Sequence, residues 1–172
     1  SLYQPPNGTY WLGTDAFGRD VLSRLIYGAR VSLVIGFGAS SLGVVVGTII
    51  GVTSGYLGGW LDSIALRLMD AMLAFPMLLL AEAMAAVLGS SVQNVIIALA
   101  MPIVPRAARI ARASTLVLKT TTFIDASRAI GCSNLRIIVV HILPNTFAPL
   151  LVIATAYLGL AIVQEAALDY LG

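Results

Sequence analysis

The chain has 172 residues, of which 59% are hydrophobic and 10% are charged, and its formal net charge is +2. An ordinary soluble domain carries about 25% charged residues, and a soluble fold of this length has too little interior to bury so much apolar surface. The composition therefore excludes a soluble domain and predicts an all-α, polytopic helical membrane protein. The single cysteine, Cys132, excludes a disulfide within these residues.

Residues 1–30 are polar to mixed and rich in turn-forming residues. They predict an external segment that precedes the first membrane span. An amphipathic helix can begin after Asp20. The nearby charges Asp15, Arg19 and Arg24 favour a local network of ion pairs and helix capping over a ligand site.

Residues 31–172 are predicted to form the transmembrane core, and its first span covers residues 31–56. That length is sufficient for a hydrocarbon core of about 30 Å, which needs ~20 residues. Four glycines on one helix face recur every four residues: Gly43, Gly47, Gly51 and Gly55. Because small residues let a second helix approach closely, we expect a helix-packing surface here. An ordinary glycine-tolerant membrane helix is the alternative.

The second predicted span, residues 61–88, would be ~42 Å long at 1.5 Å per residue and would overshoot the bilayer. Pro76 should kink it, because proline has no backbone N–H. Glu82 lies well inside this span, where a carboxylate is expensive and should face the helix bundle or a water-filled path. A partnered structural carboxylate and a residue of a translocation path both fit that position.

The third predicted span covers residues 92–104, and the fourth covers residues 147–167 with Glu165 near its far end. The intervening segment, residues 105–145, is rich in cations and holds the single acid Asp125. The cations are Arg106, Arg109, Arg112, Lys119, Arg128 and Arg136. Because basic residues collect in cytoplasmic loops, we predict that this loop is cytoplasmic; a nucleic-acid patch is the less favoured interpretation.

Two short helices are predicted within this loop. The first covers residues 123–130 and stops at Gly131, a residue that tolerates a left-handed helix stop. Ser133 can cap the second, which reaches His141 and ends before Pro144. Two short helices joined at a glycine make a compact surface for another protein to bind.

The stretch from residue 123 to residue 145 resembles the cytoplasmic EAA loop of permease subunits in binding-protein-dependent ABC importers. That pattern has an E-A-A triplet, a later glycine and a final L-P-N. The matching residues are Asp125, Ala126 and Ser127 at the triplet, Gly131 at the glycine, and Leu143, Pro144 and Asn145 at the ending. Residues 13–33 (GTDAFGRDVLSRLIYGARVSL) resemble a stretch of the C-type subunits of dipeptide, oligopeptide and nickel importers.

The resemblance implies a type I ABC importer permease fold of six transmembrane helices. We expect the chain to be a piece of a longer subunit that supplies about four of them, in the cytoplasmic (inner) membrane of a bacterium or archaeon. The implied partners are a second homologous permease subunit, two cytoplasmic ATPase subunits, an external solute-binding protein and the lipid bilayer. The implied ATPase-coupling residues are Asp125, Ala126, Ser127, Arg128, Ala129, Gly131, Pro144 and Asn145.

The expected function is movement of peptides or a related small solute, such as a dipeptide, an oligopeptide or a nickel chelate, by alternating access. No glycine-rich phosphate loop followed by Lys-Ser/Thr is present, so we expect no enzyme activity. We also expect no cofactor, metal or nucleic acid on this chain, with ATP and Mg on the partner subunits. One alternative is a proton-coupled secondary transporter using Glu82 and Glu165, and another is a membrane scaffold without transport.

Overall fold

The computed structural model describes residues 3–89 and 91–171, so the outermost residues of the two predicted regions lie outside it. These residues form helices and no β-strand, which confirms the predicted all-α class. In chain order the elements are α1 (Val21–Leu57), α2 (Gly59–Leu73), α3 (Met77–Leu88), α4 (Val92–Ala100), α5 (Ile103–Lys119), α6 (Thr122–Ala129), α7 (Asn134–Arg136), a π-helical segment η1 (Ile137–Ile142) and α8 (Leu143–Leu171).

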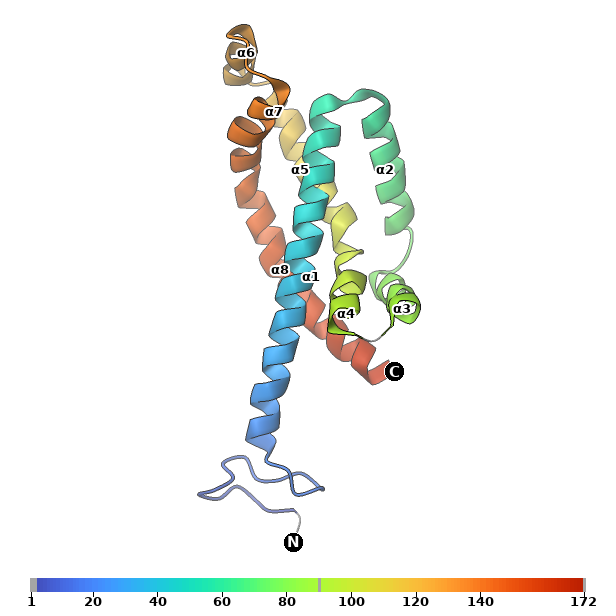
Figure 1. Ribbon diagram of the computed structural model, residues 1–172, viewed down its shortest axis with the longest axis vertical. Coiled ribbons are helices and arrows are strands. Elements are labelled where there is room, and N and C mark those ends of the chain that lie inside the picture. Colours follow the sequence, from blue (N-terminus) through green and yellow to red (C-terminus); the bar gives the residue numbers. More distant parts are fainter. Residues whose placement is uncertain (1–2, 90, 172) are drawn as a thin grey trace.

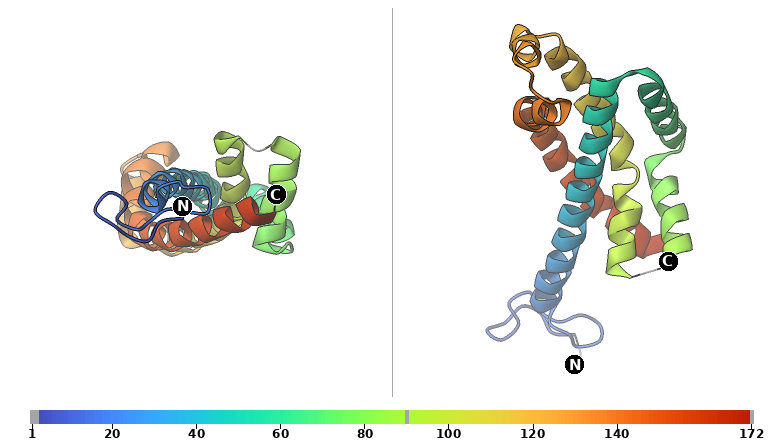
Figure 2. Two further views of the ribbon diagram at one scale, coloured as in Figure 1. Left: turned by 90° about the horizontal axis from the view of Figure 1, so that it is seen from below. Right: turned by 45° about the horizontal axis from the view of Figure 1, so that its top comes forward.

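The bundle has two ends. α1 runs from the N-terminal segment to the opposite end, and α6 lies beyond that end (Figures 1 and 2). α1 and the continuous helical run over residues 134–170 are long and apolar enough to cross a membrane. The pairs α2–α3 and α4–α5 also qualify, but they are bent by 93° and 44°. Four spans, the number predicted, result when each bent pair counts as one.

The first membrane helix begins ten residues earlier than the predicted boundary between residues 30 and 31. Its N-cap is Asp20, whose carboxylate accepts hydrogen bonds from the backbone N–H groups of Leu22 at 3.3 Å and Ser23 at 3.2 Å. A side-chain acceptor at this position satisfies N–H groups that have no partner inside the helix. The amphipathic helix expected after Asp20 is therefore continuous with the first span.

Pro76 breaks the second predicted span more strongly than expected. α2 ends at Leu73 and α3 begins at Met77, with an angle of 93° between them. Proline cannot donate a backbone hydrogen bond and disfavours the helical conformation of the residue before it, which ends α2. The stretch from residue 61 to residue 88 is therefore two helices and not one kinked helix.

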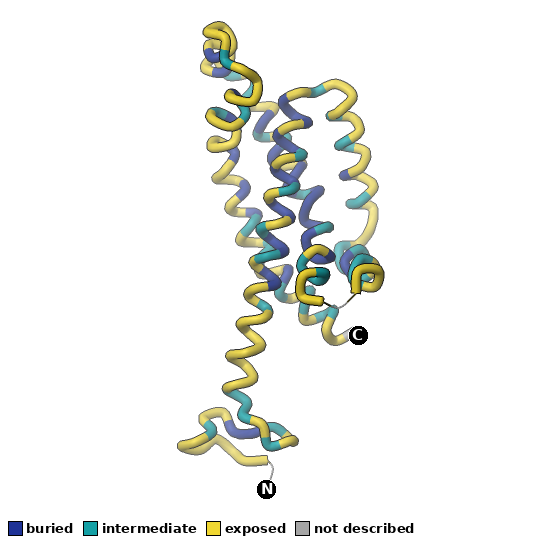
Figure 3. The backbone as a smooth tube through the Cα atoms, in the orientation of Figure 1, coloured by how far each residue is buried: buried dark blue, intermediate teal, exposed yellow. Residues whose placement is uncertain are grey.

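The closest helix packing lies between α1 and α5, and all four glycines of the predicted ridge contribute to it. A Cβ added to Gly43, Gly47 or Gly51 would stand 2.7 Å or less from an atom of α5, and one added to Gly55 would stand 3.2 Å away. These distances leave no room for a larger residue at three of the positions. Figure 3 shows the buried residues concentrated along the facing stretches of α1 and α5.

The first part of the predicted loop over residues 105–145 is helical and packs against the bundle. α5 carries residues 103–119 alongside the glycine face of α1, so the segment that leaves the bundle begins after Lys119. The sequence placed the boundary at Pro105 because the arginines begin there. Those arginines remain in the bundle because acids on α2 neutralise two of them, as described below.

The second short helix does not end before Pro144, contrary to the prediction, and the last helix begins at Leu143. The chain is helical without a break from Asn134 to Tyr170. Within η1 the hydrogen bonds reach five residues back, so that the N–H of Leu143 donates to the carbonyl of Ile138. Pro144 has no N–H to donate, and it follows this change of register, where the helix accommodates it.

Candidate functional site

α6 forms a small protruding surface at one end of the bundle. Its inner face is anchored by Ile124, which is fully buried, and by Ser127, which is 8% exposed. Its outer face exposes Asp125, Ala126, Arg128 and Ala129. Four of the eight residues assigned to ATPase coupling therefore share one exposed surface, while Ser127 faces inward and donates a hydrogen bond to the Phe123 carbonyl at 2.8 Å.

A complete C-terminal cap fixes the end of α6. Gly131 has φ +83°, in the left-handed region that residues with a side chain rarely adopt. Its N–H donates to the carbonyl of Arg128 at 2.9 Å, and the N–H of Cys132 donates to the carbonyl of Ser127 at 3.0 Å. This pair of bonds is the Schellman motif. The direction in which the chain leaves α6 is thus set by the backbone at Gly131.

The chemistry of the exposed face suits close contact with another protein. Ala126 and Ala129 are small and allow a partner to approach the helix backbone. Arg128 donates a hydrogen bond to Asp125 at 3.2 Å in an ion pair whose side chains are 38% and 67% exposed. An exposed pair of this kind contributes ~0–1 kcal/mol to stability, so both groups remain available to a partner at little cost.

A second set of contacts joins α6 to the start of α8. The ring of Phe123 meets the ring of His141 edge to face, with the centroids 6.1 Å apart. His141 lies in η1, and its carbonyl accepts a hydrogen bond from the side-chain amide of Asn145 at 2.6 Å. Pro144 and Asn145 are exposed near the base of this connection. The structure therefore places them at the junction with α8, away from the exposed face of α6.

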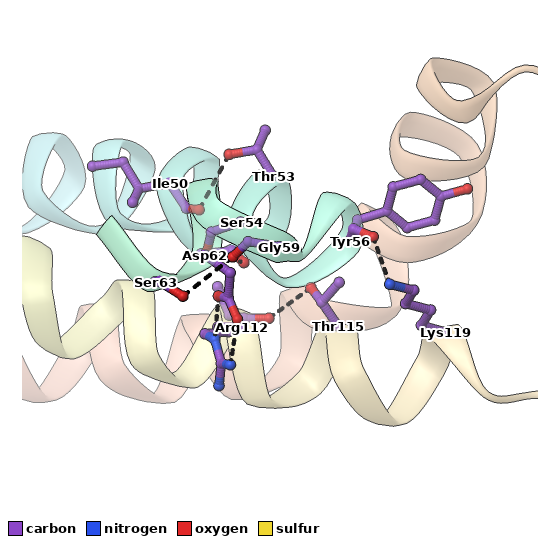
Figure 4. A network of polar contacts seen from close by, with 12 residues as sticks. Ile50, Thr53, Ser54, Tyr56, Gly59, Asp62, Ser63, Arg112, Thr115 and Lys119 are labelled. Carbon is purple, nitrogen blue, oxygen red and sulfur yellow. Dashed lines mark hydrogen bonds and ion pairs between the residues drawn. The ribbon is translucent and has the colours of Figure 1, made fainter. Parts of the chain in front are cut away.

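Two ion pairs fasten α2 to α5. Arg112 donates to both carboxylate oxygens of Asp62 at 2.6 Å, with the side chains 25% and 16% exposed (Figure 4). Arg109 pairs with Asp70 in a more exposed position. Sequence reasoning counted these arginines as loop cations and missed the pairs, because their partners lie 50 and 39 residues away. A bidentate geometry makes the Asp62–Arg112 pair the stronger of the two.

Arg106, the remaining arginine of α5, contacts a sulfur atom and an aromatic ring instead of a carboxylate. Its Nη1 lies 3.2 Å from the sulfur of Met77, and its guanidinium lies 5.9 Å from the centre of the Tyr157 ring. Arginine above an aromatic face is a favourable arrangement. All three arginines thus contact groups within the bundle. The three-residue spacing of the arginines in the sequence did not predict these contacts.

A cavity of about 570 Å³ lies where α1, α3, α4 and α8 meet near the N-terminal end of the bundle. Three carboxylates line it: Glu82, Glu165 and Asp169. The structure thereby brings together the two glutamates singled out in the sequence and adds Asp169. The remaining lining is apolar and consists of Val31, Ile35, Ala85, Ala86, Val92, Val95 and Leu168.

Glu165 has a defined partner in this cavity, since its carboxylate accepts a hydrogen bond from the hydroxyl of Ser32 at 2.9 Å. The cavity falls within the range of roughly 300–1,000 Å³ that is typical of small-molecule pockets. Over residues 3–89 and 91–171, no three His, Cys, Asp or Glu side chains are grouped closely enough to hold a metal ion.

The sequence of the chain matches a known protein family and several of its members. The family of binding-protein-dependent transport system inner membrane components matches residues 22–172. The chain is 47% identical over 169 residues to the dipeptide transport system permease protein of Alkalihalophilus pseudofirmus, covering 98% of this chain and 56% of the relative.

Two further relatives show the same extent of similarity. A putative peptide transport system permease protein of Brucella suis is 48% identical over 170 residues, covering 99% of this chain and 57% of the relative. The glutathione transport system permease protein of Escherichia coli O1:K1 is 44% identical over 172 residues, covering 100% of this chain and 57% of the relative. The chain spans 56–57% of the length of these three relatives. It belongs to the family of inner membrane components of binding-protein-dependent transport systems.

Proposed function

We propose that the chain is part of the transmembrane region of a permease subunit in an ATP-driven importer, which moves peptides or a related small solute across the cytoplasmic membrane by alternating access. Family membership and the names of the relatives, which are dipeptide, peptide and glutathione permeases, support this proposal. The observation that carries it is α6, a short helix with an anchored inner face, a small-residue outer face and a fixed C-terminal cap.

In the proposed mechanism, α6 is the coupling helix and docks in a groove of a cytoplasmic ATPase. ATP binding closes the two ATPases and displaces each coupling helix. Because the Schellman motif at Gly131 fixes the angle after α6, the displacement passes through η1 to α8. The two orientations of the bundle form one bistable element, and closure of the ATPases favours one of them.

The proposed partners are a second homologous permease subunit, two ATPases and an external solute-binding protein. ATP and Mg belong to the ATPases, since the chain has no phosphate-binding loop of its own. The α6 end is proposed to be cytoplasmic, because Arg128 and Arg136 lie there and basic residues collect on that side. The N-terminal segment, at the other end of the bundle (Figure 1), is then external.

The carboxylate cavity is proposed to be part of the solute path. It lies toward the end of the bundle away from α6, so in this orientation it is nearer the external side. Peptides carry a positively charged amino group, which Glu82, Glu165 and Asp169 would attract. A proton-coupled secondary transporter built on Glu82 and Glu165 is not favoured, because the family matched by the chain consists of components of binding-protein-dependent systems.

The test uses the full-length subunit assembled with its partners in proteoliposomes. Ala126→Asp places a charge on the outer face of α6, and Gly131→Pro demands a φ of about −65° where the backbone has φ +83°. Both changes should leave membrane insertion intact and abolish ATP-driven uptake. Ala16→Asp, an exposed alanine in the N-terminal segment, is the matched control.

Normal uptake by both α6 variants would contradict the coupling role. Uptake that continues when the proton gradient is collapsed and ATP is maintained supports the importer, and uptake that stops under those conditions supports the secondary transporter.

A further inference from the structure

Tyr56 lies in the last turn of α1 and is only 5% exposed. It contacts three other segments. Its backbone carbonyl accepts a hydrogen bond from Nζ of Lys119, the last residue of α5, at 2.7 Å (Figure 4). The carbonyls of a final helical turn have no partner inside the helix. Lys119 therefore ties the end of α5 to the end of α1.

The side chain of Tyr56 reaches in the other direction, to the segments that carry the coupling surface. Its hydroxyl donates a hydrogen bond to Oδ1 of Asn134, the first residue of α7, at 3.0 Å. The guanidinium of Arg128 in α6 lies 5.6 Å from the centre of its ring, and Nζ of Lys119 lies 5.8 Å from it. Both cations are within the ~6 Å at which a ring attracts a cation.

These contacts provide a second route out of α6. The route through Phe123 and His141 leads into α8, which follows α6 in the chain. Among the described residues, the polar contacts from α6 and α7 to α1 are both made by Tyr56. Tyr56 also belongs to the apolar cluster that contains Ile124, the buried anchor of α6.

We propose that Tyr56 is a positioning residue that passes the displacement of α6 to α1 and α5, so that these helices move together with α8. This inference rests on the proposed importer function. It follows from close packing: Gly55, Gly51 and Gly47 hold α1 against α5 immediately beside Tyr56. A displacement applied at Tyr56 therefore shifts the α1–α5 pair as a unit. The other half of α1 lines the carboxylate cavity.

The experiment is a double-mutant cycle in the assembled transporter with the full-length subunit. Tyr56→Phe removes only the hydroxyl, Asn134→Ala removes its acceptor, and the double variant removes both. Each should lower uptake roughly two- to tenfold, the size expected from the loss of one hydrogen bond. The double variant should transport no less than either single variant, because all three lose the same interaction.

ATP hydrolysis separates a coupling role from a structural one. We expect hydrolysis by the Tyr56→Phe transporter to stay close to the unmodified rate, so that the number of ATP molecules used per transported solute rises. Tyr56→Leu, which also removes the ring facing Arg128, should raise this ratio further. Tyr27→Phe and Tyr27→Leu are the matched controls, since Tyr27 is on the same helix but 72% exposed.

Three results would overturn the inference. They are uptake by Tyr56→Phe and Tyr56→Leu equal to that of the Tyr27 controls, equal loss of uptake and hydrolysis in the Tyr56 variants, or additive losses in the cycle. If the proposed function itself is wrong, the transporter with an unmodified Tyr56 will already show no ATP-dependent uptake. An Ala129→Cys variant of it will then form no cross-link with the ATPase.

Discussion

The two halves of α1 have different surroundings. Residues 43–55 lie so close to α5 that an added Cβ would collide with it at three of the four glycines. Val31 and Ile35, on the preceding turns, line a cavity of about 570 Å³. One helix thus joins a region that is closely packed against α5 to the wall of a cavity. In the proposed importer, the first region would transmit a displacement and the second would belong to the solute path.

The largest effect is expected from Gly51→Leu in the close-packed half. Its Cβ alone would stand 2.2 Å from the carbonyl oxygen of Ala108, so α1 and α5 must separate. Overpacking costs ~1–3 kcal/mol and occasionally more, and we expect a loss at or above the upper end. Thermal unfolding in detergent measures it. Gly159→Leu in α8 is the control, because no atom lies within 4 Å of an added Cβ there; equal effects would contradict the account.

A smaller effect is expected where α2 is fastened to the same region. Asp62→Ala leaves Arg112, whose side chain is 25% exposed, without its bidentate partner, and should lower the free energy of unfolding by about 1.5–3 kcal/mol, the range for hydrogen bonds to charged groups. Replacing both residues, as Asp62→Leu with Arg112→Met, should recover much of that loss. Asp70→Ala breaks a pair exposed by 51% and 59% and should cost less than ~1 kcal/mol. Denaturant titration separates these cases, and equal losses at both pairs would refute the ranking.

The cavity lined by Val31 and Ile35 is tested by charge removal. Glu165→Gln keeps the shape of the side chain and the hydrogen bond from Ser32 but replaces a carboxyl group of the cavity with an uncharged amide. Uptake of a dipeptide with a free amino group, at saturating binding protein, should fall roughly fivefold, equivalent to ~1 kcal/mol for one charge pair in water. Uptake of the same dipeptide with an acetylated amino group should not change. An equal fall for both peptides would rule out a charge contact.

The smallest effect lies outside both halves, in the N-terminal segment. The N–H of Arg19 donates to the Asp15 carboxylate, and with further hydrogen bonds from Phe17 and Arg24 it lowers the pKa of Asp15 to about 2. A lowered pKa adds stability that is fully present above the ordinary value of 3.8 and is lost as the pH falls through about 2.

The protection of the backbone amides of residues 3–20 from hydrogen exchange, corrected for the intrinsic rate at each pH, should therefore fall only below about pH 4. The Asp15→Asn variant should lack this pH dependence. A transition that persists in the variant would assign it to another group.

Several features were predictable from the sequence because they depend on local chemistry. The four-residue spacing of Gly43 to Gly55 predicts a close helix contact, and Pro76 predicts a disturbance of its helix. Gly131 predicts the end of α6 because glycine readily adopts the left-handed conformation that ends a helix, and it does so here. In each case the signal is carried by the residue type and its local spacing.

Features that depend on partners far away in the chain were not predictable. The spacing of the glycines does not identify α5 as the partner of α1, and Asp62 lies 50 residues from Arg112. The sequence therefore identifies the arginines of α5 only as loop cations and does not reveal their ion pairs with α2. Pro144 predicted a helix end, but the π-helical register of η1 carries the helix through it. Tyr56 carried no signal of its own, since its role depends on three segments that meet only in the folded chain.

The most direct test of the central claim, that α6 couples the bundle to an ATPase, is disulfide cross-linking in membranes. The full-length subunit carries Ala129→Cys together with Cys132→Ser, and the co-expressed ATPase carries cysteines along its groove. Ala129 is exposed on the outer face of α6, so we predict a cross-link whose yield changes when ATP is added. Free labelling of that cysteine by a water-soluble thiol reagent in every nucleotide state, with no cross-link, would contradict the account.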